Sequence, residues 1–385
     1  MAGYVTRLEG VERINTEIAV LGTHNKRPSL YRGQTQAIID RLHPKQLNLE
    51  VSEIIDRPGG AKTLRFVSQN GYLPVFQAGQ YINIFVEIDG VRTSRPYSIS
   101  SSPRQRGYYD LTIAPVEQGF VSGYLLKNVQ VGDQFESSAP SGEFHYNPAF
   151  HSKNMIMLAG GSGITPFMSM SREVLDSGID RNLHLIYGCR NESCAVFLDE
   201  LKDMEARHSN FTLTVVASAP ETGYKGKTGF ISSEVIREAL EGFGGDATFY
   251  ICGPQAMYEF TRKELDSLNI PQRKIRQEMF GARRDIQNEP GWPQELDGSE
   301  VFKITLDDGR TIDGRSGESL LTALERAGVR VNVCCRSGVC SLCRVKLVKG
   351  KVFMPEGVLL RYTDEQFGYI HSCQAYPIGD VEIAL

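Results

Sequence analysis

The sequence lacks the features that would place the protein in a membrane or on a nucleic acid. No apolar run reaches the roughly 18 residues that a membrane-spanning helix requires. The first residues contain no apolar core of the kind found in signal peptides. Basic residues are not in excess, since the formal net charge is −4, which gives no electrostatic reason to expect a nucleic-acid partner. We therefore expect a globular protein of the cytoplasm.

Cysteine is also scarce over most of the chain. Only eight cysteines occur in 385 residues, and five of them lie between Cys334 and Cys373. A disulfide framework would spread its cysteines over the chain, so this concentration predicts a cluster or metal site. The length and the 41% hydrophobic content allow two or three globular domains.

Four of these cysteines have the spacing C-x4-C-x2-C, with the fourth far downstream. They are Cys335, Cys340, Cys343 and Cys373. Plant-type ferredoxins use this spacing to hold a [2Fe–2S] cluster through four thiolates. Zinc is the alternative, since two cysteines two residues apart also suit zinc, but three ligands in one short loop favour the cluster. Cys334 is out of step with this spacing, and we predict that it is not a ligand.

Residues 300–385 resemble a plant-type ferredoxin along their whole length. The pattern predicts a hairpin over residues 302–313, around an Asp-Asp-Gly turn, and an amphipathic helix that stops near Gly328. The resemblance implies an α+β fold of the β-grasp type.

A second region, residues 46–150, consists of short alternating strands that predict an antiparallel barrel or sandwich. It contains Arg95-Pro96-Tyr97-Ser98 followed by Ser101. These residues match the R-x-Y-S-x-x-S/T signature of the ferredoxin–NADP reductase superfamily. The chain therefore resembles a member of this superfamily. The resemblance implies a flavin-binding β-barrel, with Arg95 on a phosphate, Tyr97 stacked on the flavin ring and Ser98 at flavin N5. The alternative is an ordinary strand with an arginine and a core tyrosine.

A further element strengthens the resemblance. Gly119-Phe120-Val121-Ser122 follows Thr112-Ile113 at the interval usual in the superfamily. In relatives this G-x-x-S segment holds the flavin pyrophosphate on backbone N–H groups at a helix start. A pyrophosphate site favours FAD, although relatives of the phthalate dioxygenase reductase type use FMN.

Residues 151–282 alternate strands with helices, which predicts a parallel α/β sheet. After an apolar strand come Gly160, Gly161, Gly163, Thr165 and Pro166. We expect the glycines to let backbone donors approach the pyrophosphate of a nicotinamide dinucleotide, with Thr165 as the helix N-cap and Pro166 as the first helical residue. A plain strand-to-helix turn is the alternative.

Three later features match the superfamily in order. Arg190 ends a Tyr-Gly-x-Arg strand, Cys252-Gly253-Pro254 resembles the Cys-Gly-Pro motif, and Glu278 belongs to a Glu-x-Phe segment. The resemblance implies that Cys252 aligns hydride donor and acceptor, and that Glu278 lies near the flavin. With Ser98 these form the expected catalytic set. Without the resemblance, Cys252 would be a small buried residue that closes a strand.

The remaining segments carry no chemical motif. Residues 1–45 form an N-terminal extension, in which residues 35–42 predict a short helix that ends before Pro44. Residues 283–299 contain two prolines and no periodicity, which indicates a linker. We expect Trp292, the only tryptophan, to anchor this linker on a neighbouring domain.

The resemblance implies an NAD(P)H-dependent oxidoreductase that passes hydride electrons through FAD to the [2Fe–2S] cluster and then singly to a partner metalloprotein. Oxygenases, demethylases and hybrid-cluster proteins are the expected acceptors. Glu192 follows Arg190 closely and would repel a 2′-phosphate, so we expect NADH in preference to NADPH. The alternatives are a flavin and iron–sulfur redox sensor with little turnover, and the same enzyme run in reverse.

Overall fold

The computed structural model describes residues 33–42, 44–283 and 285–385 of the chain, which separates into two units, residues 1–45 and 46–385. In the first unit, α3 (Gln34–Leu42) confirms the predicted helix before Pro44. Gln36 Nε2 donates to Asp40 Oδ1 at 2.8 Å along this helix. The rest of the N-terminal extension that the sequence left without a motif, residues 1–32, lies outside the described residues. None of the helices in the described part of the chain is both long and apolar enough to cross a membrane.

The second unit begins with an antiparallel β-barrel, as predicted. Its sheet has the order β4-β3-β6-β1-β2-β5. The strands are β1 (Gln46–Asp56), β2 (Lys62–Ser68), β3 (Tyr81–Ile88), β4 (Val91–Ser98), β5 (Tyr109–Ile113) and β6 (Gln134–Ser138). A bridge between Ile99 and Leu111 brings the end of β4 beside β5. Helix α4 (Phe120–Asn128) packs Val121 and Leu125 into the apolar core of this barrel.

A six-stranded parallel sheet follows, with the order β10-β9-β8-β7-β11-β12. Its strands are β7 (Asn154–Gly160), β8 (Asn182–Cys189), β9 (Phe211–Ala217), β10 (Lys227–Thr228), β11 (Thr248–Cys252) and β12 (Ile275–Glu278). Its helices are α5 (Ile164–Asp176), α6 (Leu198–Arg207), α7 (Ser233–Gly242) and α8 (Gln255–Ser267).

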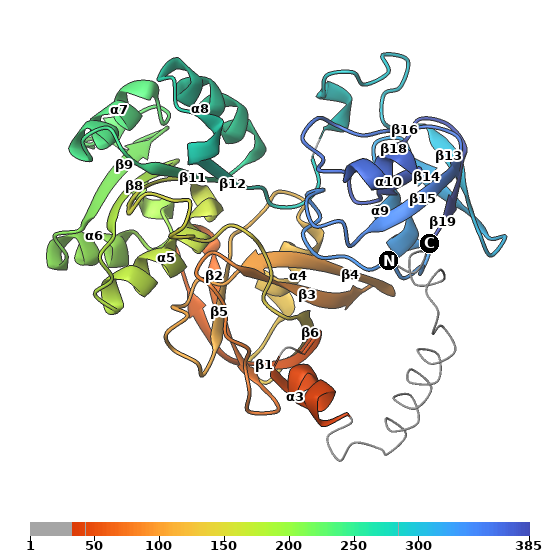
Figure 1. Cartoon of the computed structure of the whole chain (residues 1–385), viewed down its shortest axis with the longest axis horizontal. Coiled ribbons are helices and arrows are strands. Elements are labelled where there is room, and N and C mark those ends of the chain that lie inside the picture. The colour runs from red at the N-terminus through yellow and green to blue at the C-terminus, as the bar shows by residue number, and fades with distance from the viewer. Residues whose placement is uncertain (1–32, 43, 284) are drawn as a thin grey trace, which may run out of the picture. The chain divides into compact units, whose positions relative to one another are not determined.

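Both faces of the parallel sheet are buried, which explains why its strands are continuously apolar. In β7, Met155 and Met157 pack into the core under α5 and α6, whereas Ile156 and Leu158 pack into the core under α7 and α8. Figure 1 shows these two helix pairs on opposite faces of the sheet. The predicted α/β fold is therefore confirmed.

The C-terminal part is a five-stranded mixed sheet with the order β14-β13-β19-β15-β17. The strands are β13 (Val301–Leu306), β14 (Thr311–Arg315), β15 (Arg344–Lys349), β17 (Tyr369–His371) and β19 (Val381–Ala384), with a two-stranded sheet of β16 (Val352–Phe353) and β18 (Tyr376–Pro377) beside them. Helix α9 (Leu320–Arg326) supplies Leu320 and Leu324 to the core, and a short helix α10 (Tyr362–Gln366) precedes β17. The predicted hairpin and β-grasp fold are confirmed.

Short 3₁₀ turns connect several of these elements: η1 (Pro58–Gly60), η3 (Glu192–Cys194), η4 (Gln272–Lys274) and η5 (Ile286–Asn288). The last of them lies in the segment predicted to be a linker. In that segment the Trp292 ring is 7% exposed and meets the ring of Phe353 edge-on at 5.3 Å. Its Nε1 donates to the carbonyl of Leu296 at 2.8 Å. Trp292 therefore fixes the segment to the C-terminal sheet, as expected from the sequence.

Candidate functional site

Most residues predicted to bind the flavin lie in the wall of one cavity of about 440 Å³. This volume falls within the range of small-molecule sites. From the predicted set the wall contains Arg95, Pro96, Tyr97, Ser98, Thr112, Ile113, Gly119, Phe120, Val121, Ser122 and Thr165, together with Cys373. It also contains Phe280 of the predicted Glu-x-Phe segment, and residues that the sequence analysis missed, among them Arg283, Thr322 and Arg336. The barrel, the α/β part and the C-terminal part of the second unit thus all contribute residues to one site.

Strand β4 presents the Arg95–Ser98 motif to this cavity through its pairing with β3, in which Arg95 lies opposite Ile84 and Tyr97 opposite Ile82. The guanidinium of Arg95 donates to the Ser94 carbonyl at 2.7 Å. Burial first and the nearby charge of Arg336 second lower the pKa of Arg95 to about 10, and Glu325 opposes both. A cation enclosed in this way favours an anionic ligand, which fits a flavin phosphate.

Helix α4 directs its first turn at the same cavity. Gly119 is the N-cap residue and offers no side-chain hydrogen bond to the first backbone N–H groups. A Cβ atom on Gly119 would lie 2.1 Å from Ser122 Oγ, so the turn has no room for a larger residue. An uncapped helix start beside a buried arginine is suited to a phosphate or pyrophosphate. The residues present therefore fit FAD.

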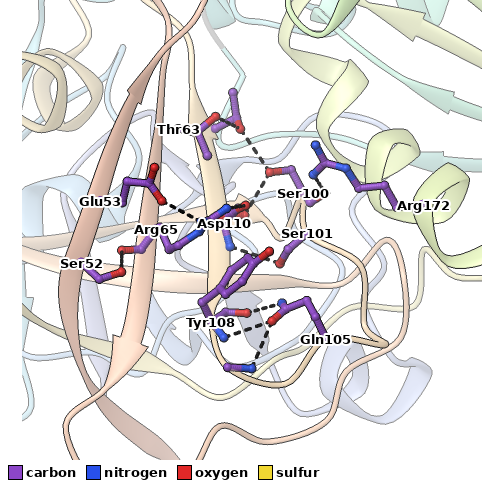
Figure 2. A network of polar contacts seen from close by, with 12 residues as sticks. Ser52, Glu53, Thr63, Arg65, Ser100, Ser101, Gln105, Tyr108, Asp110 and Arg172 are labelled. Atoms are coloured by element: carbon purple, nitrogen blue, oxygen red, sulfur yellow. Dashed lines mark hydrogen bonds and ion pairs between the residues drawn. The ribbon is translucent and has the colours of Figure 1, made fainter. Parts of the chain in front are cut away.

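A polar network behind β4 joins the barrel to α5 (Figure 2). Ser100 Oγ donates to the Asp110 carbonyl at 3.1 Å, and Arg172 of α5 donates to the Ser100 carbonyl at 2.7 Å. The hydroxyl of Thr112 is 3.1 Å from Ser100 Oγ, so this predicted flavin residue uses its side chain inside the barrel. Ser169 Oγ donates to the Ser101 carbonyl at 2.7 Å. The network fixes α5, and with it the glycine loop, to the end of β4.

The three residues expected to be catalytic lie close together. Ser98 Oγ donates to Glu278 Oε2 at 3.3 Å. Glu278 ends β12 directly opposite Cys252 at the end of β11, because these parallel strands are in register. Burial raises the pKa of the Cys252 thiol well above its usual value, which keeps it protonated. Cys252 thus suits packing and alignment better than nucleophilic attack.

The glycine loop differs from the prediction in one respect. Thr165 is not the N-cap and Pro166 is not the first helical residue, because α5 begins at Ile164 with Gly163 as its N-cap. A 3₁₀ turn, η2 (Gly161–Gly163), lengthens the helix start, and Thr165 Oγ1 donates back to the Ser162 carbonyl at 3.1 Å.

The glycines of this loop also have a packing role. A Cβ atom on Gly163 would lie 2.1 Å from the carbonyl oxygen of Cys252. One on Gly160 would lie 2.4 Å from Met257 Sδ and 2.9 Å from Pro254 Cδ, and one on Gly253 would lie 2.5 Å from the same sulfur. The loop after β7 and the turn after β11 are therefore in backbone contact.

Arg190 does not lie beside the other residues predicted to bind a cofactor. Its side chain is exposed just after β8, and its carbonyl accepts from the Ala219 N–H at 2.8 Å. It is absent from the wall of the described cavity.

The four predicted cluster ligands are arranged as two pairs. The thiol of Cys335 interacts with that of Cys340, which lowers the pKa of Cys335, and the thiol of Cys343 interacts with that of Cys373, which lowers the pKa of Cys343. Within the described residues, no three side chains of His, Cys, Asp or Glu surround a point where one metal ion would be held. A zinc ion requires four ligands around one centre, whereas a [2Fe–2S] cluster has two irons with two thiolates each. The pairing of the four thiols therefore fits a [2Fe–2S] cluster.

The loop conformation around the ligands also suits a cluster. Arg336, Gly338 and Ser341 all have positive φ angles, of 56°, 81° and 60°. The Ser337 N–H donates to Cys335 Sγ at 3.4 Å. Cys334 points elsewhere, and its Sγ lies 3.6 Å from Tyr81 Oη of the barrel.

Known families match each of the three parts. The Oxidoreductase FAD-binding domain family matches residues 63–146, the Oxidoreductase NAD-binding domain family residues 157–263, and the 2Fe-2S iron-sulfur cluster binding domain family residues 304–377.

Whole proteins match over most of their length. The chain is 30% identical over 316 residues to NADH oxidoreductase HCR of Escherichia coli, covering 81% of this chain and 90% of the relative. It is 26% identical to the glycine betaine monooxygenase reductase subunit of Chromohalobacter salexigens, covering 87% and 94%. Among solved structures, phthalate dioxygenase reductase superposes with a TM-score of 0.66 at 25% identity, covering 88% of this chain and 98% of the other.

Fold, site and relatives together define a flavin- and iron–sulfur-dependent oxidoreductase. The chain belongs to the ferredoxin–NADP reductase superfamily, in the group whose members carry a plant-type [2Fe–2S] ferredoxin domain. Its cofactors are FAD and a [2Fe–2S] cluster, and its electrons come from NAD(P)H. The relatives are named as reductases and oxidoreductases, which supports an enzyme and not the alternative of a redox sensor.

The enclosed carboxyl of Glu278 predicts a pH effect on stability. Burial raises the pKa of Glu278 from 4.5 to about 8, against the opposing hydrogen bond from Ser98. Between about pH 5 and 8 the folded state therefore holds more protons than the unfolded state, so the free energy of unfolding falls as pH rises. In flavin-free wild-type protein, Glu278 should lower the free energy of unfolding by on the order of 3 kcal/mol between pH 5 and 8, and Glu278→Gln should abolish this decrease.

Urea unfolding at several pH values, followed by circular dichroism, measures this loss. The exposed Glu221 provides a matched control, and Glu221→Gln should follow the wild type. Parallel pH curves for Glu278→Gln and the wild type would contradict the assignment.

Proposed function

We propose that this protein is the reductase component of an oxygenase system, which takes electrons from NADH and delivers them to a partner metalloprotein. The names of several relatives support an oxygenase partner, including the betaine monooxygenase reductase subunit and the ferredoxin reductase component of 3-ketosteroid-9-alpha-monooxygenase from Mycobacterium tuberculosis, which is 28% identical over 362 residues. The observation that carries the proposal is the single cavity shared by β4, α4 and the cysteine loop. A flavin in this cavity would lie beside the proposed cluster ligand Cys373.

The residues of the barrel would hold the flavin. FAD held there would supply hydride chemistry, and the cluster held by the cysteines would supply one-electron transfer. Arg95 and the N–H groups from Gly119 to Ser122 would hold its phosphates, while Tyr97 would pack on its ring and Ser98 would face N5. Because Glu278 retains its proton near neutral pH and lies 3.3 Å from Ser98, this pair would supply or receive the proton that accompanies electron transfer.

The contact between the glycine loop and the Cys252 turn would form the nicotinamide side of the site. Gly161 has open space where a side chain would begin, just before the start of α5, and Gly253 and Pro254 follow the strand that ends in Cys252. This placement supports a nicotinamide ring beside Cys252 and the flavin, with Thr165 and Pro166 in the helix turn below it. Arg190, which is exposed, would reach only the outer part of the dinucleotide.

Electrons would leave through the cysteine loop. Cys340 is the most exposed of the four proposed ligands, since the other three are buried. Val339 and Leu342, on either side of it, are 50% and 52% exposed. An exposed apolar rim next to a redox centre supports docking of an acceptor protein at this loop.

The two adjacent cysteines test the ligand assignment. Cys335→Ser should abolish the visible absorbance of the cluster, because a thiolate ligand is lost. Cys334→Ser should retain it, because Cys334 contacts Tyr81 of the barrel. Absorbance and iron content of the purified variants measure the outcome, and the opposite result would show that the ligand register is displaced by one residue.

The path of the electrons is tested by two acceptors. In Cys340→Ser, reduction of ferricyanide by NADH should stay within about twofold of the wild type, because the flavin reduces ferricyanide directly. Reduction of cytochrome c should fall at least about tenfold, because it requires the cluster. Cys334→Ser serves as the control and should retain both activities. Undiminished cytochrome c reduction in Cys340→Ser would mean that electrons bypass the cluster.

The choice of nicotinamide can be tested at Glu192. This residue follows β8 in η3, where its Oε1 accepts from Lys202 at 2.8 Å. A carboxylate there disfavours a 2′-phosphate, so kcat/KM should be higher for NADH than for NADPH. Glu192→Gln should raise kcat/KM for NADPH by about threefold to tenfold with little change for NADH. If the ratio of kcat/KM for NADPH to kcat/KM for NADH does not change, the 2′-phosphate of NADPH does not lie near Glu192.

A further inference from the structure

Arg336 connects the cysteine loop to the flavin barrel. It directly follows the proposed ligand Cys335, and its side chain is only 5% exposed. Its guanidinium forms an ion pair with Glu325 of α9. It also donates to Ser94 Oγ at 3.2 Å and to Thr93 Oγ1 at 3.3 Å, both on β4. The same β4 segment contains Arg95.

One donor of this guanidinium has no partner. Arg336 Nε is buried without a hydrogen bond in the described structure, and Arg336 lies in the wall of the flavin cavity with Arg95. A buried donor without an acceptor is unfavourable, and native structures rarely keep one unless a ligand or water satisfies it.

The charges around this donor are not balanced. Arg95 and Arg336 are close enough that the charge of Arg336 lowers the pKa of Arg95. Among the residues that the structure describes, Glu325 is the acid that pairs with Arg336 and also raises the pKa of Arg95. Two enclosed cations with one carboxylate leave a net positive charge, which an anion in the cavity would neutralise.

We propose that Arg336 binds the phosphate portion of the flavin together with Arg95, so that the ferredoxin domain supplies part of the flavin-binding site. The inference rests on FAD occupying this cavity, as in the proposed function. Its consequence is that FAD binding and docking of the ferredoxin domain on β4 strengthen each other.

A simpler role for Arg336 is a clamp that pairs with Glu325 within the ferredoxin domain and holds that domain on Thr93 and Ser94 of β4. The two roles differ in how they depend on the ligand. A clamp would affect the binding of every flavin equally, and loss of Arg336 or of Glu325 would change flavin affinity to the same extent. A phosphate contact acts on FAD but not on riboflavin, which has no phosphate, and removal of Glu325 leaves it intact.

The test uses the full chain, depleted of flavin but retaining its cluster, titrated with FAD or riboflavin and followed by flavin fluorescence. Arg336→Gln should weaken FAD binding about tenfold to a hundredfold and leave riboflavin binding unchanged. Glu325→Gln, the matched control, should bind FAD within about threefold of the wild type. Visible circular dichroism of the cluster verifies that each variant is folded.

Three results would overturn the proposal: unchanged FAD affinity in Arg336→Gln, equal losses in Arg336→Gln and Glu325→Gln, or equal losses for FAD and riboflavin. If Arg336→Gln loses its cluster, the same comparison is made with Arg336→Lys, whose single ammonium cannot replace the fork of donors. Failure of the wild type itself to bind FAD would instead refute the proposed function.

Discussion

The stretch from Thr93 to Ser101 is the constraint on which the arrangement of the site depends. Its N-terminal end accepts hydrogen bonds from Arg336 of the cysteine loop, its centre faces the cavity, and its C-terminal end accepts hydrogen bonds from Arg172 and Ser169 of α5. One extended segment therefore touches the parts that would hold the cluster, the flavin and the nicotinamide. Since electron transfer depends on proximity, a strand with contacts at both ends would position the three proposed redox sites through a single element.

The parts of the site that could be predicted are those in which chemistry lies within a few consecutive residues. Arg95 to Ser98 and Gly119 to Ser122 were identified because each motif fits in one strand end or one helix turn, and all of these residues line the cavity. The fold was predictable for a similar reason. Buried parallel strands such as β7 are continuously apolar, and the antiparallel hairpin of β13 and β14 has a recognisable turn.

The missed and mistaken residues depend on long-range contacts. Arg336 contacts Thr93 across 243 positions of the sequence, and no local pattern encodes such a contact. Threonine is favoured at the N-cap, so Thr165 was expected there, but the preceding 3₁₀ turn moves the helix start to Ile164. That turn is set by backbone contact between Gly163 and the carbonyl of Cys252, which lies 89 positions away (252 − 163) in another strand. The glycines were expected to serve a cofactor, and the structure adds that they serve packing.

The ion pair of Arg336 with Glu325 shows why a redox protein would keep charges in an interface. A buried pair loses the hydration of both ions and on average adds little stability compared with apolar residues of similar size. The pair instead restricts how α9 and the cysteine loop are oriented, because a bidentate arginine forms its hydrogen bonds in few geometries. Here Nε of Arg336 also remains buried without a hydrogen bond, in a residue that lines the cavity. If a flavin phosphate accepts a hydrogen bond from this remaining donor, all donors of Arg336 have partners only when the flavin is bound. The cluster would then be held against the barrel in the state that can deliver electrons to it, and less firmly in the state that cannot.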